Sequence, residues 1–362
     1  MNTKENDLFE LLNNRKEKNN VKIISNKNDI NINKLIVLKN DDICISTKNG
    51  NIIIYNKDNL EEKLNIKNFE TNEEINDIIE KDDGGLLYWG NKFIKFINLS
   101  LNNKSYNIKN EYNIYSKSNN INSIVELSNK ILIISNDNSQ IQLWKKKILH
   151  GKYKCIHNYI YIKDIEKDDK SFLFKIKNDS FIFNSFKKNT LSFFNINNYE
   201  KIRLKTELKN IKIIKGNTPI IKYPNEDYLL LSCVEYDNNE EIEEENNNNA
   251  YDDLYFNYKR DFSIMIIDTN NFNVIGRIKN NYPFIDMKYY LGNTFVALDM
   301  YGVIHKIEFD KYKQKLFLID KINFNNDLRL DNNKITGFNL TGNRNSAILY
   351  LSNKIIIISN YE

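Results

Sequence analysis

Short apolar runs separated by polar turns repeat along the chain, and residues 121–147 show the pattern most clearly. Apolar side chains recur through 121–127, and a second apolar run at 131–135 is too short for a helix. Asn and Asp at 136–139 tolerate left-handed backbone and bond their own main chain, so they predict a tight turn. A third run ends at Trp144. The stretch therefore predicts three consecutive β-strands.

The same unit recurs seven times: strand, tight turn, strand, turn, strand ending in an aromatic or aliphatic residue, then a polar fourth strand. Asn49-Gly50 and Asp83-Gly84 are typical hairpin turns of such units. The predicted units cover residues 32–69, 75–115, 121–157, 172–206, 220–278, 285–320 and 335–359. Their third strands end at Tyr55, Phe96, Trp144, Phe194, Ile267, Ile307 and Ile358.

Successive third-strand ends lie about 41, 48, 50, 73, 40 and 51 residues apart. The long interval contains an insertion of about 24 residues, and about 49 remain without it. A period of about 40–50 residues with four strands per unit is typical of β-propellers. We therefore expect an all-β fold, a seven-bladed β-propeller with four-stranded antiparallel blades.

The seventh unit has only three predicted strands before the chain ends at Glu362. Val21 to Ser25 reads as a spare strand at the other end, so we expect it to complete the seventh blade and remove an exposed edge. Residues 1–20 are polar apart from Leu8, Phe9, Leu11 and Leu12, whose spacing predicts a short helix. The expected organisation is an extension at 1–20 and one propeller at 21–362.

The pattern resembles the WD40 repeat family over nearly the whole chain. The resemblance rests on the strand rhythm, on Trp144 at the family's tryptophan position, and on the short Asn/Asp/Gly turns between second and third strands. Two family features are missing: no Trp-Asp pair occurs, and His150-Gly151 reverses the family's Gly-His pair. We therefore expect a divergent member that lacks the family's His–Asp network in most blades. Kelch blades each use a glycine pair, and only Gly84-Gly85 occurs here.

Nothing in the sequence predicts catalysis. The three histidines, His150, His157 and His305, have no recognisable nucleophile or metal-ligand frame around them, and glycine-rich phosphate loops are absent. Three widely spaced cysteines and a polar N-terminus without an apolar signal region fit a reducing compartment. We expect a protein that is not an enzyme, without a cofactor, a metal site or a transmembrane segment, in the cytoplasm, with the nucleus left open.

Asp237 to Arg260 is the most distinctive local feature. It carries eight acidic residues against Lys259 and Arg260, while the whole chain has a net charge of +4. Its acidic half, Glu240 to Asn249, is predicted to be disordered. Its second half places Tyr255 and other aromatics beside acids, a composition that can anchor a basic partner. A solvated spacer of drifted sequence is the alternative.

Basic residues concentrate in the third and fourth units, where residues 144–215 hold about 18 Lys/Arg against about 7 Asp/Glu. This sector could meet an anionic membrane or another polyanion, although solvated lysines are the simpler interpretation. The paired-arginine motif of some phosphoinositide-binding propellers is absent, and nucleic acid is not expected as a partner because the overall charge is near neutral. The basic patch consists of Lys145, Lys146, Lys147, Lys152 and Lys154, and a second loop carries Lys187 and Lys188.

The resemblance implies a non-enzymatic scaffold or adaptor that binds proteins or peptides with the loops at the ring mouth. The alternative is a peripheral membrane or polyanion-binding propeller that uses the basic sector of the third and fourth blades. A propeller hydrolase would need carboxylates that converge on the central channel. The predicted partner-binding residues lie in the turns between second and third strands: Asn49, Asn91, Asp137, Lys187, Tyr255 and Tyr301.

Overall fold

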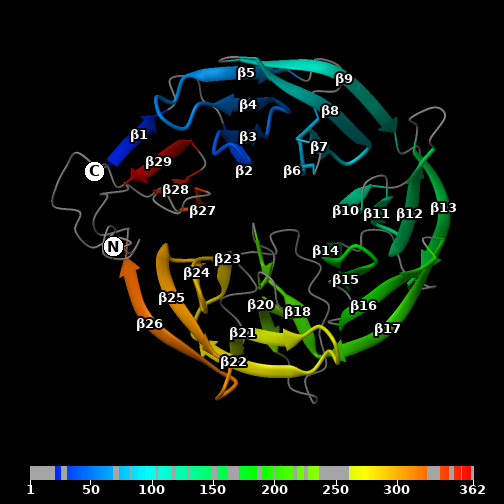
Figure 1. The fold of residues 1–362 in the computed structure, drawn as a ribbon, viewed down its shortest axis with the longest axis vertical. Coiled ribbons are helices and arrows are strands. Elements are labelled where there is room, and N and C mark those ends of the chain that lie inside the picture. Colours follow the sequence, from blue (N-terminus) through cyan, green and yellow to red (C-terminus); the bar gives the residue numbers. More distant parts are fainter. Residues whose placement is uncertain are drawn as a thin grey trace, which may run out of the picture.

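Seven four-stranded units form a closed ring in the computed structural model (Figure 1). The first strand of each blade lies at the centre and the fourth lies at the rim. The structure describes residues 21–25, 31–67, 73–81, 84–102, 105–115, 120–128, 131–147, 153–161, 171–185, 190–198, 200–214, 218–223, 227–235, 261–323, 335–341, 346–351 and 353–359. Among these segments, no helix is long and apolar enough to cross a membrane.

The blades follow one another in chain order, and each is an antiparallel sheet. Blade one contains β2 (Ile32–Val37), β3 (Ile43–Thr47), β4 (Ile52–Tyr55) and β5 (Glu62–Ile66). Blade two contains β6 (Asp77–Glu80), β7 (Leu86–Trp89), β8 (Phe93–Asn102) and β9 (Ser105–Tyr115). Blade three contains β10 (Ile121–Ser128), β11 (Ile131–Asn136), β12 (Gln140–Lys146) and β13 (Tyr153–Ile160). Blade four contains β14 (Ser171–Lys177), β15 (Ser180–Ser185), β16 (Thr190–Asn197) and β17 (Lys201–Lys209).

Blade five divides its innermost strand into two short pieces, β18 (Ile211–Ile213) and β19 (Ile220–Lys222), which both pair with β20 (Tyr228–Glu235). β21 (Asp261–Asp268) and β22 (Val274–Asn280) complete this blade. Blade six contains β23 (Phe284–Tyr289), β24 (Thr294–Asp299), β25 (Val303–Asp310) and β26 (Lys315–Asn323). Blade seven contains β27 (Gly337–Leu340), β28 (Ser346–Tyr350) and β29 (Lys354–Ser359), with β1 (Val21–Ser25) as its fourth strand.

The ring closes as the sequence predicts, because β1 pairs antiparallel with β29. The register runs without interruption from Val21 opposite Ile358 to Ser25 opposite Lys354. The two ends of the ordered propeller are thus joined in one sheet, and the apolar strand β29 gains a partner on each side.

The hydrophobic core lies between the blades rather than inside any one of them. Successive side chains of a strand point to opposite faces, so a middle strand contributes to two neighbouring interfaces. In β24, Phe295 and Ala297 pack toward blade five, whereas Val296 and Leu298 pack toward blade seven. This explains why the second strands are continuous apolar runs in the sequence, because both of their faces are buried.

Asparagines link neighbouring blades around the centre. The Asn76 side chain donates to the carbonyl oxygen of Ile121 at 3.3 Å, and the Asn122 side chain donates to Ser171 Oγ at 3.2 Å. Asn339 closes the circle by donating to the carbonyl oxygen of Leu35 at 2.9 Å. These residues bridge blades two to three, three to four and seven to one. These asparagines therefore have a structural role that the composition of the chain does not reveal.

Two elements differ from the sequence expectation. The apolar pattern predicts the fourth strand of blade two at Ser105 to Ile108, but β9 is longer and continues to Tyr115. The sequence reading also missed β18, because a strand of three residues gives no recognisable period. The predicted N-terminal helix at 1–20 and the whole insertion at 237–260 lie outside the described residues and remain predictions.

Candidate protein-interaction face

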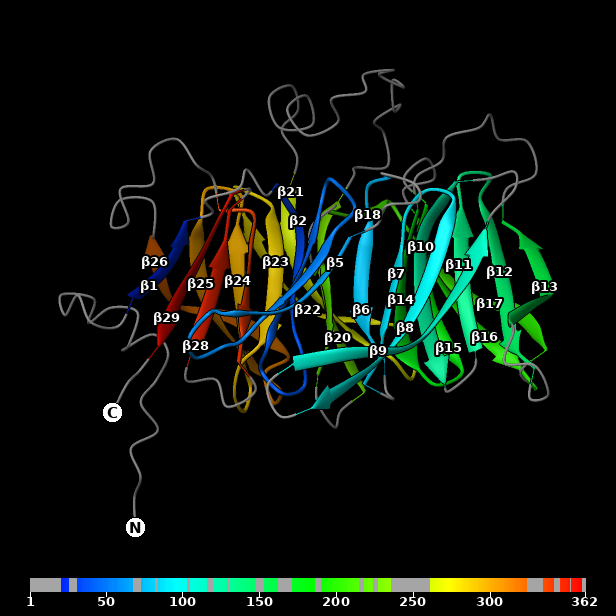
Figure 2. The same cartoon turned by 90° about the horizontal axis from the view of Figure 1, so that it is seen from above.

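The antiparallel order gives the ring two different ends (Figure 2). Turns between second and third strands share one end with the connections that lead from each blade to the next. We call this end the mouth face. The turns between first and second strands and between third and fourth strands lie at the opposite end, the base face. Any loop residue can therefore be assigned to a face from its place in the blade.

Four predicted partner-binding residues lie on the mouth face within the described segments. Asn49 and Asn91 are exposed, and Tyr301 keeps 48% of its surface exposed. Asp137 is half-buried, and its backbone N–H donates to the carbonyl oxygen of Asn120 at 3.0 Å. Lys187 and Tyr255 lie outside the described residues, although the strands that flank them end at this face.

Asn91 combines exposure with a structural role. Its side-chain oxygen accepts from the Asn76 side chain at 2.9 Å, and its carbonyl oxygen accepts from the N–H of Ile121 at 2.8 Å. Both contacts fix the junction between blades two and three. Its side chain is therefore less available to a partner than that of Asn49, which has no such contact among the described residues.

Tyr301 forms an aromatic pair with Tyr282 on the mouth face of blade six. The ring centroids are 4.5 Å apart with an interplanar angle of 78°, an edge-to-face arrangement. Tyr282 is 43% exposed and lies in the connection from blade five to blade six. The sequence predicts Tyr301 as a partner-binding residue because it lies in a turn between second and third strands. It does not predict Tyr282, which lies outside these turns.

The turn that carries Tyr301 is rigid. Asp299 Oδ1 accepts from the backbone N–H groups of Tyr301 and Val303, both at 2.9 Å. Its other oxygen lies 2.9 Å from Nε2 of His305, and Phe284 packs edge-on against the His305 ring. Blade six thus holds a buried His–Asp pair, in which Asp299 ends the second strand and His305 belongs to the third. The pair orients the turn, and the aromatic surface above it is pre-organised.

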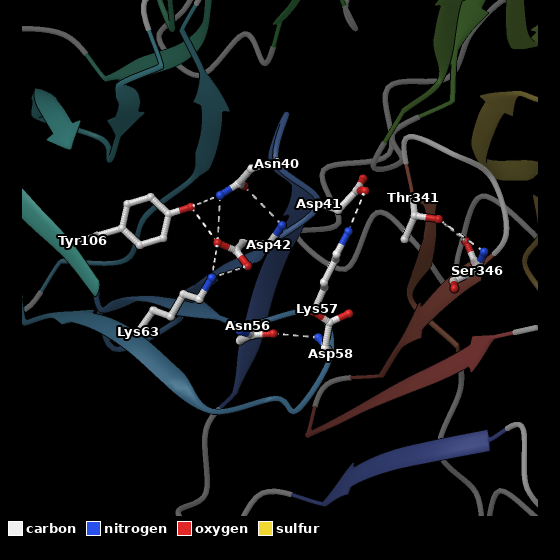
Figure 3. A network of polar contacts seen from close by, with 10 residues as sticks. All are labelled: Asn40, Asp41, Asp42, Asn56, Lys57, Asp58, Lys63, Tyr106, Thr341 and Ser346. Carbon is white, nitrogen blue, oxygen red and sulfur yellow. Dashed lines mark hydrogen bonds and ion pairs between the residues drawn. The ribbon is translucent and has the colours of Figure 1, made fainter. Parts of the chain in front are cut away.

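The base face of blade one differs, because its polar side chains bond one another (Figure 3). Asp42 is almost fully buried and accepts from Lys63 Nζ with both oxygens at 2.8 Å. The Tyr106 hydroxyl donates to Asp42 Oδ2 at 2.8 Å, and the Asn40 side chain donates to the same oxygen at 2.9 Å. Burial raises the pKa of Tyr106, and the hydrogen bond to Asp42 raises it further.

This base cluster, Asn40, Asp42, Lys63 and Tyr106, joins two blades. Tyr106 belongs to β9, so the long outer hairpin of blade two reaches under blade one (Figures 2 and 3). Lys63 is the extra residue of a β-bulge in β5, which redirects its side chain toward the turn at Asp42. The Asp42 carboxylate and the Lys63 ammonium group pair with each other, and the cluster therefore has a structural role at the junction of blades one and two.

The basic patch lies at the base end of blade three. Lys145, Lys147 and Lys154 are exposed there, and Lys146 Nζ lies 6.0 Å from the centre of the Tyr153 ring. Lys152 is outside the described residues. Lys187 is also outside the described residues, but β15 ends and β16 begins at the mouth face, at the end of the ring opposite the basic patch.

Carboxylates and lysines of the innermost strands form ion pairs. Asp286 is buried, with Lys288 Nζ at 2.9 Å and the backbone N–H of Phe338 at 3.0 Å. Burial lowers the pKa of Lys288. Lys34 and Asp77 face each other at 3.4 Å across blades one and two. Asp77 and Asp286 thus pair with lysines on the central strands, and the described residues contain no group of three or more potential metal ligands.

Comparison with known proteins extends the description of the fold. No protein-family model matches the chain, and no curated protein matches it by sequence. Several solved structures are similar to this protein. The crystal structure of the RRP9 WD40 repeats matches at a TM-score of 0.61 and 9% identity, over 94% of this chain and 97% of that one. The Neurospora crassa Pan2 WD40 domain matches at a TM-score of 0.59 and 10% identity, over 94% of this chain and 95% of that one. A chain of the Mitotic Checkpoint Complex matches at 0.62 and 7%, over 94% of each chain.

At such low identity these likenesses show the fold alone. The strand order, the four-stranded blades and the ring of seven agree with the sequence prediction, and two of these similar structures are titled as WD40 structures. The protein therefore has the fold of a WD40-type seven-bladed β-propeller.

Proposed function

We propose that the protein is a non-enzymatic interaction module that binds a partner protein or peptide on its mouth face. The Tyr282–Tyr301 pair carries this proposal, because its two aromatic rings are half-exposed and the turn that holds Tyr301 is fixed by Asp299. Tyrosine is enriched among the residues that dominate binding energies, and rigid presentation reduces the entropy lost on association. The fold supports a scaffold or adaptor role, and we propose the cytoplasm as its compartment, with the nucleus left open.

An affinity capture from the native cell tests the proposal. Wild-type protein and the double variant Tyr282→Ala/Tyr301→Ala would be compared by quantitative mass spectrometry. Tyr312→Ala is the matched control, since Tyr312 is a fully exposed tyrosine on the base face of the same blade. We expect the double variant alone to lose its principal partner. Equal recovery by all three proteins would contradict a mouth-face site at blade six.

The insertion after β20 is a second contributor to this proposed site. Its flanking strands stay in register up to Glu235 opposite Asp261, and Arg277 forms an ion pair with Glu235 at 2.8 Å. A short hairpin turn could therefore rejoin the strands. We expect replacement of residues 237–260 by Asn-Gly to leave the melting temperature unchanged and to abolish capture of a basic partner. If capture persists, the insertion is a spacer.

A second candidate function is binding to an anionic membrane or polyanion through the basic patch. Lys145 and Lys154 occupy directly opposed positions in the ladder of blade three, where like charges repel unless an anion screens them. Reversal of Lys145, Lys146 and Lys147 to Glu should abolish liposome or polyanion binding that weakens steeply with salt. Unchanged binding by this variant would exclude the patch.

A further inference from the structure

The fourth strands of six blades contain a β-bulge at the same place, opposite the third strand. The register shifts by one residue in each of β5, β9, β13, β17, β22 and β26. We call the bulged residue and the two before it the rim triplet. From blade one to blade six the triplets are Glu61-Glu62-Lys63, Asn107-Ile108-Lys109, Lys154-Cys155-Ile156, Arg203-Leu204-Lys205, Asn273-Val274-Ile275 and Phe317-Leu318-Ile319.

Blade six alone among these has three apolar residues in its rim triplet. Phe317, Leu318 and Ile319 are 42%, 48% and 48% exposed. The bulge explains this exposure, because an extra residue reverses which face of the strand a side chain occupies. Leu316 packs toward blade five and Ile322 packs toward blade seven, so the triplet lies where the strand turns over and enters neither interface.

Charged residues surround the triplet in a particular order. Lys315 and Lys321 are exposed on β26 on either side of it, and Lys313 Nζ lies 5.7 Å from the centre of the Phe317 ring. Acidic side chains are also close in the ladder, since Glu308 is opposite Phe317 and Asp320 follows Ile319. The carboxylates beside the apolar residues disfavour a continuous anionic surface such as a lipid membrane. The lysines lie at the two ends of the triplet and therefore favour acidic groups on either side of an apolar contact.

We propose that the rim triplet of blade six is a docking surface for a segment of a partner protein that has apolar residues at its centre and acidic residues on both sides. Within the described segments β26 pairs only with β25, and contiguous exposed apolar side chains mark interaction sites. The surface lies on the outer wall, apart from the Tyr282–Tyr301 pair, and does not depend on the mouth-face function.

Blade four provides a matched control inside the same molecule. Arg203, Leu204 and Lys205 occupy the positions of Phe317, Leu318 and Ile319, and this triplet is also exposed. The fold thus accepts charges at these positions. Phe317→Arg/Ile319→Lys should fold normally and lose the surface, whereas Arg203→Phe/Lys205→Ile should create a second one. Leu318→Ser is a milder variant if the double substitution lowers the melting temperature.

The experiment is a selection of random short peptides, displayed on phage, against the wild-type chain with the Phe317→Arg/Ile319→Lys variant as counter-selection. We expect enrichment of peptides with an apolar centre and acidic flanks. The consensus peptide should bind the wild type at least about tenfold more tightly than the loss variant by fluorescence anisotropy, a loss of about 1.4 kcal/mol. It should bind the blade-four gain variant more tightly than the wild type.

Three results would overturn the proposal. Equal affinity of the consensus peptide for wild type and loss variant would place its site elsewhere. Triplet-dependent flotation with vesicles of phosphatidylserine and phosphatidylcholine, without peptide selection, would assign the surface to lipid. A wild-type dimer in light scattering that the loss variant abolishes would assign it to a second copy of the chain.

Discussion

The base cluster of blade one and the mouth face of blade six use polar and aromatic side chains in opposite ways. At the base, Asp42 is 2% exposed, and its carboxylate bonds the side chains of Lys63, Tyr106 and Asn40. At the mouth, Asp299 is equally buried, but its hydrogen bonds hold a turn whose Tyr301 ring faces outward. The buried carboxylate of Asp42 thus joins two blades of the ring, whereas that of Asp299 fixes a turn with an exposed aromatic ring.

The difference predicts that stability and binding can be separated. Substitutions at the base cluster should lower the free energy of unfolding because they leave buried groups without partners. Substitutions in the Tyr282–Tyr301 pair should change binding with little effect on stability, since much of each ring is already in water.

Removal of residues 1–26 should have the largest effect. β1 runs from the base face to the mouth face, and its loss exposes the edge of β29, whose Ile355, Ile356, Ile357 and Ile358 are buried. We expect a markedly lower melting temperature or an insoluble protein, measured by differential scanning calorimetry and by the soluble fraction. A truncated chain that melts like the full chain would refute closure of the ring by β1.

Asp42→Asn should destabilise the protein by about 3 kcal/mol, because Lys63 would keep its charge in a largely buried site without a carboxylate. Chemical denaturation provides the measurement. The adjacent Asp41→Asn is the control: Asp41 bonds Lys57, which is 38% exposed, so solvent screens the pair and the loss should stay below about 1 kcal/mol. Similar losses of unfolding free energy for both variants would contradict the structural role of the base cluster.

Tyr106→Phe should cost about 1.5 kcal/mol, because it removes the hydroxyl that donates to Asp42 and leaves the hairpin packing intact. The pKa of Tyr106 is raised by burial, so the folded protein keeps this proton at pH values where an unfolded tyrosine, with a pKa of about 10, loses it. The free energy of unfolding must therefore fall as the pH rises above about 10. Phenylalanine should reduce that fall, and an unchanged alkaline profile would argue against the contact.

Tyr282→Ala/Tyr301→Ala should have the smallest effect on stability, about 0.5–1 kcal/mol, which is the usual contribution of an edge-to-face pair. Asp299→Ala is the informative counterpart, because it removes the buried support of the same turn and should cost clearly more. Thermal unfolding of both variants provides the comparison. A larger loss from the tyrosines than from Asp299 would mean that the pair is part of the core.

The sequence predicted the repeat well because the buried middle strands are continuous apolar runs and the turns between them use Asn, Asp and Gly. The same pattern located Tyr301 and the closing strand at Val21 to Ser25. The position of Trp144 at the end of a third strand also predicts burial between blades; Trp144 packs against the interface of blades two and three, but it is only half-buried. Trp89 is the buried tryptophan, and its place in a second strand gave no signal distinct from the other apolar residues.

Contacts between distant parts of the chain could not be predicted in this way. Asp42 and Tyr106 meet only because β8 and β9 extend beyond the usual blade, and their sequence separation carries no periodic signal. Tyr282 and Tyr301 meet because a blade-to-blade connection lies beside a turn of the next blade. The rim triplet of blade six likewise depends on a bulge that only the ladder register reveals.

We propose that a partner binds the mouth face, whereas the polar side chains at the base of blade one bond one another. Hydrogen–deuterium exchange of the protein with its captured partner, compared with the free protein, tests this difference between the two faces. We predict slower exchange at the backbone amides of Tyr282 and of residues 300–303, with unchanged exchange at residues 39–42 and 105–107. Protection confined to the base residues, with the blade-six turns unchanged, would contradict the account.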